Sequence, residues 1–241
     1  MSKTLHLYLG IDGGQSSTTA MIGDETGRVI GLGSGGPCNH VGAAEGRPKF
    51  VRAIRGCIAT ACLQAGLDSE SVEFQAACLG FSGGPADKKS ILDEILGAQN
   101  RILTTDAAIA LTGATGGQPG IIIIAGTGSI SLGRNAKGQT ARAGGWGYIY
   151  GDEGGGFDIA RQAVRAVLRH EEGWGPATVL RDILLSETAT QNANDMMHAL
   201  YTAEHPRPRI AGYSKLVDAA ASEGDMVARN IILNAAQQLA T

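Results

Sequence analysis

The sequence lacks the features that mark several classes of protein. It contains no Walker A sequence, so a P-loop nucleotide site is excluded. Its 20 Lys and Arg residues against 23 Asp and Glu give a net charge of −3, and the basic residues do not cluster. Nucleic acid and anionic membrane are therefore not expected as partners. No apolar run is long enough to span a bilayer, because Gly and Ser interrupt the run at 119–132.

Cysteine and histidine are few and carry no metal-binding pattern. None of the five histidines stands at a metal-ligand spacing, and the four cysteines show no CxxC pairing. The cysteines are expected to be reduced and mostly buried, as in a cytoplasmic protein. The first residues lead directly into an expected strand without a secretory apolar region, which also favours the cytoplasm. The cysteines are Cys38, Cys57, Cys62 and Cys78.

Two glycine patterns match known motifs but lack the context that those motifs need. Residues 31–36 read GLGSGG, a dinucleotide-binding pattern, yet no helix is expected to open there and Pro37 follows. Residues 80–84 read GFSGG, the pattern of a hydrolase nucleophile elbow. An elbow needs a helix that starts at the serine, whereas Gly84-Pro85 predicts a loop. We interpret residues 80–84 as a turn at the end of a strand.

Glycine is abundant, with 36 of 241 residues, about twice its usual share of about 7%. The most informative use of it is one hairpin pattern that occurs twice, as LYLGIDGGQSSTTAMI at 7–22 and IIIIAGTGSISLG at 121–133. Each copy has an apolar strand, a turn of Gly, Ser and Thr, and a second strand. Such turns expose backbone N–H groups and hydroxyls that suit anionic oxygens, so two of them could hold a polyphosphate. Only the first copy has a carboxylate at its turn, because Asp12 aligns with Ala125.

The order of expected elements indicates a mixed α/β fold in two domains. Three strands, expected to form an antiparallel meander, precede alternating helices and strands in residues 1–116. The pattern restarts in 117–241 with three more strands, but only helices are expected after 153, so this second domain is expected to be incomplete at its C-terminus. The expected strands are 5–12, 17–23, 27–33, 73–81, 101–104, 121–125, 128–134 and 139–143. The expected helices are 48–66, 87–97, one from 106, and then 155–170, 176–186, 191–201, 208–221 and 225–239.

Two further segments carry candidate chemistry. Asp106 follows a short strand at the expected start of a helix, where a carboxylate also serves as an ordinary cap. Residues 144–156 read GGWGYIYGDEGGG, and a tryptophan between glycines is costly unless it packs on something. Asp152 in this stretch stands at the entrance of the next helix. Each of these aspartates, and Asp12 as well, has an ordinary structural role as the alternative.

Seven fragments follow one another along the chain: GIDGG at 10–14, PCNH at 37–40, TDA at 105–107, AGTGS at 125–129, GGWG at 144–147, GDEG at 151–154 and IAGY at 210–213. In this order and spacing, the chain resembles the sugar kinases of the actin/hexokinase/Hsp70 phosphotransferase superfamily. The most similar branch is that of the N-acetylglucosamine kinases, grouped with the BadF/BadG/BcrA/BcrD-type ATPases. The resemblance implies two ribonuclease-H-like domains around a cleft that holds ATP, the second one shortened.

The resemblance also implies an activity and a role for each matching residue. The activity is ATP-dependent phosphorylation of the 6-hydroxyl of an aminosugar, with ATP and Mg²⁺ as cofactors and N-acetylglucosamine or glucosamine as substrate. Asp12 would orient Mg²⁺, and Asp106 would be the catalytic base. The implied sugar contacts are Asn39, Asp106, Gly145, Trp146, Gly147 and Asp152. The implied nucleotide contacts are Gly13, Gly14, Ser16, Gly126, Thr127, Gly128 and Gly212.

Other interpretations stay open from the sequence alone. Another hexose derivative could be the substrate, because no residue in the sequence is specific for an acetyl group. A reductase-activating ATPase of the same family would need cysteines for an iron–sulfur cluster at a subunit interface, whereas all cysteines here precede position 79. A non-catalytic sugar-binding remnant would keep the sugar loop without the adenosine half, although it would need neither Asp12 nor Asp106. A homodimer is also left open as the assembly.

Overall fold

The structure is a computed structural model that describes residues 6–14, 17–38 and 46–240. It divides the chain into two units, Met1–Gln118 and Pro119–Thr241. The junction lies close to residues 116 and 117, between which the sequence predicts a domain boundary. Two predicted site residues, Ser16 and Asn39, lie outside the described residues.

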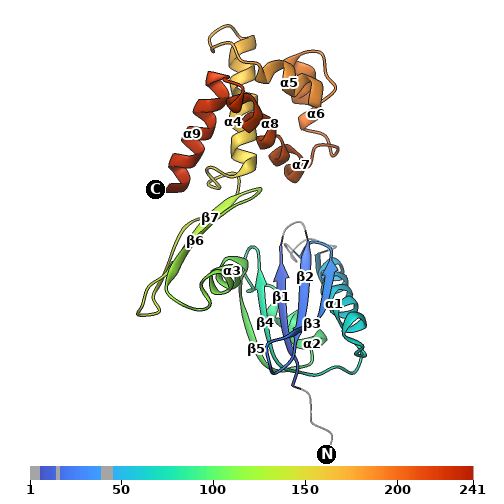
Figure 1. The fold of residues 1–241 in the computed structure, drawn as a ribbon. Coiled ribbons are helices and arrows are strands. Elements are labelled where there is room, and N and C mark those ends of the chain that lie inside the picture. The colour runs from blue at the N-terminus through green and yellow to red at the C-terminus, as the bar shows by residue number, and fades with distance from the viewer. Residues whose placement is uncertain (1–5, 15–16, 39–45, 241) are drawn as a thin grey trace, which may run out of the picture. The chain divides into compact units, whose positions relative to one another are not determined.

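The first unit is built on one mixed sheet of five strands. They are β1 (Tyr8–Gly13), β2 (Thr18–Gly23), β3 (Val29–Gly35), β4 (Phe74–Phe81) and β5 (Ala98–Thr105). Their spatial order is β3-β2-β1-β4-β5 (Figure 1). The first three strands pair antiparallel, as the sequence predicts, while β4 pairs parallel with both β1 and β5. Helical crossovers account for the change, because parallel neighbours cannot be joined by a tight turn.

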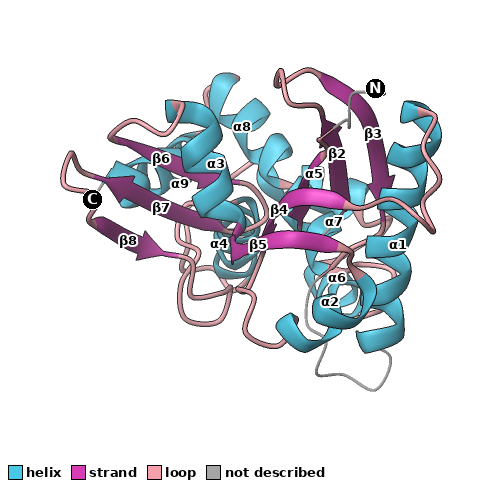
Figure 2. Ribbon diagram, turned by 90° about the horizontal axis from the view of Figure 1, so that it is seen from below, coloured by secondary structure: helices cyan, strands magenta, loops and turns pink. Residues whose placement is uncertain are grey.

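Glycines allow a helix to lie directly on the edge strand of this sheet. The helices of the unit are α1 (Gly46–Ala65), α2 (Lys89–Ile95) and α3 (Asp106–Thr115). A methyl group on Gly33 would overlap the carbonyl oxygen of Cys57 in α1 and lie 2.6 Å from the backbone nitrogen of Ala61. Gly31 and Gly35 meet the same helix backbone, and Figure 2 shows α1 beside β3. The glycine pattern at 31–36 is therefore a packing feature of a strand.

The substitution Gly33→Ala should lower the free energy of unfolding by about 3 kcal/mol, the upper end of the usual range for overpacking. The reason is that the added methyl group meets helix backbone, which cannot rotate away. Urea denaturation measures the effect, and Gly36→Ala is the matched control because nothing lies within 4 Å of a Cβ at that position. Equal stability of the two variants would contradict this packing.

The core of the first unit lies against one face of α1. The buried side chains of α1 include four that recur at four-residue steps: Phe50, Ile54, Ile58 and Cys62. They pack with buried residues of β1, β2, β4 and α2. Each fully buried large apolar side chain contributes about 1.5–3 kcal/mol relative to an exposed one, so this face holds the unit together.

The second unit begins with an antiparallel sheet and continues as helices. Its strands are β6 (Gly120–Ala125), β7 (Ser129–Arg134) and β8 (Thr140–Gly144), in the order β6-β7-β8. Its helices are α4 (Gly156–Glu171), α5 (Leu180–Glu187), α6 (Ala193–Leu200), α7 (Arg207–Gly212), α8 (Ser214–Ser222) and α9 (Met226–Ala240). No strand follows α4 in the described part of the chain. Of the helices that the structure describes, none has both the length and the apolar character needed to cross a bilayer.

Helix α4 is central to the second unit, and α5, α7, α8 and α9 pack against it (Figure 1). Its buried face comprises Ala160, Ala163, Val164 and Val167, which join one apolar cluster with residues of the surrounding helices. The predicted strands and helices are confirmed to within a few residues. One difference is that the predicted helix 208–221 divides at Tyr213. Two successive i→i−3 hydrogen bonds, Tyr213 N to Ile210 O and Leu216 N to Tyr213 O, tighten the chain there.

Candidate functional site

The candidate site residues of the first unit meet at the ends of β1 and β4. Asp12 pairs in register with Gly80, so the two residues face the same side of the sheet. A methyl group on Gly80 would lie 2.7 Å from Cδ1 of Ile109 and 2.8 Å from the carbonyl oxygen of Thr105. The absence of a side chain at Gly80 therefore lets α3 begin on the side to which Asp12 points.

Asp106 is the first residue of α3. The hydroxyl of Thr105, the N-cap residue, accepts a hydrogen bond from the backbone nitrogen of Ala108 (3.2 Å), and Oδ1 of Asp106 accepts one from that of Ala107 (2.8 Å). The cap leaves Oδ2 of Asp106 without a hydrogen-bond partner among the described residues. This oxygen can accept a proton or a further hydrogen bond.

Asp12 and Asp106 interact through their charges. Burial raises the pKa of Asp12, and the negative charge of Asp106 raises this pKa further. Two carboxylates that repel each other favour a bound cation. Among the described residues no group of three or more His, Cys, Asp or Glu side chains could hold a metal ion. Carboxylates of this kind fit Mg²⁺, which keeps several waters and uses one or two carboxylates beside substrate phosphates.

Removing the charge of Asp12 should stabilise the unliganded protein. Because the pKa of Asp12 is higher in the folded than in the unfolded state, wild-type stability falls as the pH rises from the ordinary carboxyl range through that raised value. We expect Asp12→Asn to raise the free energy of unfolding at pH 7 by about 0.2–1 kcal/mol, the range for solvent-exposed charge pairs. The gain should shrink as the pH falls toward 4. Urea titrations at both pH values measure it, and a less stable variant at pH 7 would refute the repulsion.

The residues that open turn 1, Gly13 and Gly14, are closely packed. A methyl group on Gly13 would overlap the ring of Phe81 and lie 3.2 Å from Cβ of Cys38. The amide of Gly14 donates to the carbonyl of Ser17 (2.9 Å), and its carbonyl accepts from the amide of Cys38 (3.1 Å). The amide of Gly14 is thus committed inside the turn, and Gly13 is required for packing.

Lys88 is a buried residue that sequence reasoning missed. Its ammonium group donates to the carbonyl oxygen of Gly84 (2.9 Å) and to Asp87 (2.7 Å), 5.8 Å from the centre of the Phe81 ring. These bonds hold the loop after β4 against the aromatic ring on which Gly13 packs. Ser82 lies in this loop, and because α2 begins only at Lys89, no helix starts at the serine of the elbow-like pattern.

Turn 2, residues 126–128, caps the central helix of the second unit. The carbonyl oxygens of Gly126 and Thr127 accept hydrogen bonds from the backbone nitrogens of Gly156 (2.8 Å) and Phe157 (3.1 Å) at the start of α4. The amide of Gly126 donates to the carbonyl of Gly128 (2.9 Å). Within the described residues, the amides of Thr127 and Gly128 have no hydrogen-bond partner. Two free amides beside a helix N-terminus are suited to anionic oxygens.

The tryptophan loop, residues 144–156, is shaped by glycines in the left-handed region. Gly145 has φ +71° and donates its amide to the carbonyl of Ser129 (2.9 Å), while Gly147 has φ +85°. The indole of Trp146 is 70% exposed and lies against the guanidinium of Arg142, 4.3 Å from the ring centre. Trp146 is therefore held at the surface rather than in the core.

Asp152 joins this loop to turn 2. Its side chain is buried, and Oδ1 accepts a hydrogen bond from the amide of Gly147 (3.2 Å). A methyl group on Gly128 would overlap Oδ2 of Asp152 and lie 2.6 Å from its carboxyl carbon. Asp152 also has φ +62°, a strained conformation for a residue with a side chain, and such strain of about 1–3 kcal/mol is concentrated at functional sites.

The contact between Gly128 and Asp152 can be tested on the unliganded protein. We expect Gly128→Ala to lower the free energy of unfolding by about 1–3 kcal/mol, because the methyl group displaces a buried carboxylate. The control is Gly126→Ala, since nothing lies within 4 Å of a Cβ there and its φ is outside the left-handed region. Differential scanning calorimetry compares the two variants. Identical melting temperatures would show that Asp152 does not press on turn 2.

Gly212 ends α7 and is exposed. A methyl group on Gly156 would lie 3.0 Å from the carbonyl oxygen of Ala211, the residue before Gly212, and 3.2 Å from the carbonyl oxygen of Gly126. The end of α7 and turn 2 therefore meet at the start of α4. The structure brings together Gly126, Thr127, Gly128, Gly145, Trp146, Gly147, Asp152 and Gly212 in the second unit, and Asp12, Gly13, Gly14 and Asp106 in the first.

The cysteines do not form an exposed ligand set. Cys38, Cys57 and Cys62 are buried and Cys78 is half-buried, all as free thiols. Burial raises the pKa of the Cys57 thiol to about 12. Buried, protonated thiols cannot bridge an iron–sulfur cluster at a subunit interface, so this arrangement does not favour a reductase-activating ATPase.

Together, the five-stranded sheet, the two glycine-turn hairpins and the helical second unit define the α/β fold of actin-like ATPases. The model of the BadF/BadG/BcrA/BcrD ATPase family matches residues 9–241. The chain belongs to this family and uses ATP.

Two characterised relatives are similar over nearly the whole chain. The N-acetylmuramic acid/N-acetylglucosamine kinase of Clostridium acetobutylicum is 34% identical over 236 residues, which is 96% of this chain and 76% of the relative. The N-acetyl-D-glucosamine kinase of Dictyostelium discoideum is 31% identical over 257 residues, 99% of this chain and 78% of the relative. A solved structure of a candidate N-acetylglucosamine kinase from Chromobacterium violaceum superposes with a TM-score of 0.84 at 27% identity, covering 98% of this chain and 81% of that one.

Proposed function

We propose that the chain is an ATP-dependent kinase that phosphorylates the 6-hydroxyl of an aminosugar, with N-acetylglucosamine as the first candidate substrate and glucosamine as the second. The observation that carries this proposal is the buried carboxylate of Asp152, which contacts the tryptophan loop and turn 2. A group that pairs sugar hydroxyls then stands beside amides that can bind phosphate. The sugar kinases among the relatives support the choice of substrate.

In the proposed reaction, Oδ2 of Asp106 accepts the proton of the 6-hydroxyl. The sugar oxygen forms a bond to the γ-phosphorus of ATP, and the bond from that phosphorus to the bridging oxygen breaks, so the products are a sugar 6-phosphate and ADP. The amides of Thr127 and Gly128 bind phosphate oxygens and hold them for in-line transfer. Asp12 would hold Mg²⁺ through a water molecule, and the bound ion would neutralise phosphate charge.

Recognition of the sugar is proposed to depend on Asp152, Asn39 and the backbone of Gly145 to Gly147, with Trp146 covering the ring. A pocket built to pair hydroxyls rejects sugars that leave its buried polar groups unpaired. Ser16 and Gly212 are proposed as further nucleotide contacts. A cytoplasmic location and a homodimeric assembly stay predictions.

A coupled ADP-release assay with a panel of aminosugars and hexoses tests the proposal. We expect release that depends on N-acetylglucosamine or glucosamine, and we expect Asp106→Asn to lower kcat by about 10²–10⁴, the usual contribution of acid–base catalysis. Sugar binding measured by calorimetry should persist in this variant, because the loop of the second unit is unchanged.

The matched control is Glu73→Gln, which removes an exposed carboxylate of the same unit. It should turn over like the wild type. Sugar binding without turnover in the wild type would instead identify a sugar-binding remnant. Turnover that persists in Asp106→Asn would show that Asp106 is not the catalytic base.

A further inference from the structure

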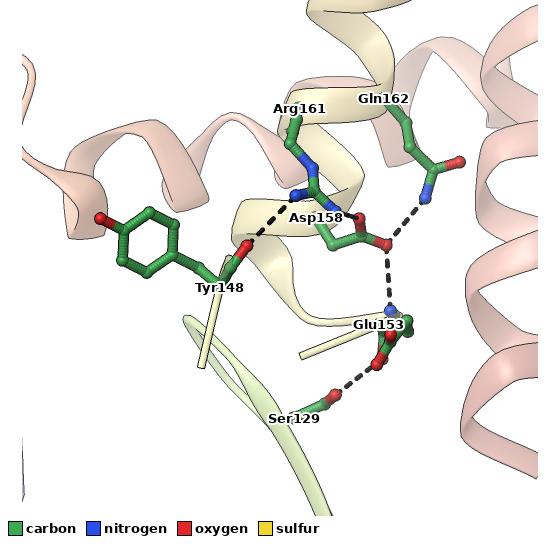
Figure 3. A network of polar contacts seen from close by, with 7 residues as sticks. Ser129, Tyr148, Glu153, Asp158, Arg161 and Gln162 are labelled. Atoms are coloured by element: carbon green, nitrogen blue, oxygen red, sulfur yellow. Dashed lines mark hydrogen bonds and ion pairs between the residues drawn. The ribbon is translucent and has the colours of Figure 1, made fainter. Parts of the chain in front are cut away.

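Asp158 is the centre of a polar network under the tryptophan loop (Figure 3). It lies in the first turn of α4 and is buried. Its Oδ2 accepts hydrogen bonds from the amide of Gly154 (3.2 Å) and from Nε2 of Gln162 (2.8 Å), and its Oδ1 pairs with the guanidinium of Arg161 (2.6 Å). One carboxylate thus links the end of the loop to the helix that follows it.

Arg161 extends this network to the other side of the loop. While one of its terminal nitrogens binds Asp158, the other donates to the carbonyl oxygen of Tyr148 (3.1 Å), and Figure 3 shows both bonds. Tyr148 lies four residues before Asp152 and Gly154 two residues after it. The pair of Asp158 and Arg161 therefore holds the chain on both sides of Asp152.

A third anchor connects the loop to turn 2. The hydroxyl of Ser129, the residue after the turn, donates to the carbonyl oxygen of Glu153 (2.6 Å). Tyr148, Glu153 and Gly154 are each fixed by a side chain from outside the loop. A backbone with φ +62° at Asp152 persists only where its surroundings determine it, and these three bonds are such surroundings.

We propose that Asp158 and Arg161 are positioning residues for the sugar site, a proposal that rests on the function proposed above. They act through the tryptophan loop, by holding Asp152 and the amide of Gly147 where sugar hydroxyls are bound. They act less on the phosphate side, because turn 2 keeps its own bonds to Gly156 and Phe157. Their loss should therefore weaken sugar binding more than it slows phosphoryl transfer.

The substitution Asp158→Asn keeps the size of the side chain and removes the charge that holds Arg161. We expect the KM for the sugar to rise by about 10-fold or more, since small displacements of binding groups can cost up to about 100-fold. The KM for ATP should stay within about twofold of the wild type. A purely structural role would instead lower kcat through a smaller folded fraction and leave the KM for the sugar unchanged.

Two further variants examine the pair itself. Arg161→Ala should raise the KM for the sugar as Asp158→Asn does, and Arg161→Lys, which keeps the charge but not the fork that reaches two partners, should fall between Arg161→Ala and the wild type. Because the residues act as one unit, the double variant Asp158→Asn/Arg161→Ala should be no worse than either single variant. Asp218→Asn, an exposed carboxylate on α8, is the control and should match the wild type.

A readout that needs no enzymatic activity follows from the two tryptophans of the sequence. In a Trp174→Phe background, Trp146 in the loop is the sole tryptophan, and its fluorescence anisotropy reports the mobility of the loop. We expect Asp158→Asn to lower this anisotropy in the unliganded protein, and Asp218→Asn to leave it unchanged.

The outcomes separate the two proposals. If the wild type shows no sugar-dependent turnover while Asp158→Asn still lowers the anisotropy, the proposed function fails and the positioning of the loop holds. If the wild type turns over and Asp158→Asn has the sugar KM and the anisotropy of Asp218→Asn, the positioning role is overturned.

Discussion

The second unit depends on one close approach, between the backbone of Gly128 and the carboxylate of Asp152. No room for a methyl group exists between them. This contact fixes the tryptophan loop against turn 2, and turn 2 in turn caps α4 through Gly126 and Thr127. The loop, the turn and the helix start therefore form one assembly. Within it, the carboxylate proposed to bind sugar hydroxyls and the amides proposed to bind phosphate are held at a fixed separation.

The first unit uses the same device with different residues. Gly80 allows α3 to begin close to the end of β4, and this start brings Asp106 near enough to raise the pKa of Asp12. In both units a glycine without room for a side chain decides where a carboxylate stands. The high glycine content therefore has two physical origins: close backbone approach at positions such as Gly33 and Gly80, and left-handed backbone at loop positions such as Gly147.

The elements of the fold could be predicted because hydrophobic periodicity reports which face of each segment is buried. The repeated hairpin and the loop around Trp146 were also visible as glycine patterns. Contacts between distant segments could not be predicted, because periodicity does not show which residues lie against each other. Lys88 was missed because a lysine before a helix is ordinarily solvated. Asp158 was missed because an acidic residue in the first turn of a helix is ordinarily explained by its favourable interaction with the helix dipole. An arginine three residues later was the only sign of the network.

The central claim is that this chain transfers a phosphoryl group to a sugar rather than to water. The ³¹P NMR spectrum of the chain with ATP, Mg²⁺ and N-acetylglucosamine tests it most directly. The account predicts that the ATP signals give way to those of ADP and of a phosphomonoester coupled to the protons on carbon 6 of the sugar. Inorganic phosphate as the sole phosphorylated product besides ADP, or an unchanged ATP spectrum, would contradict it.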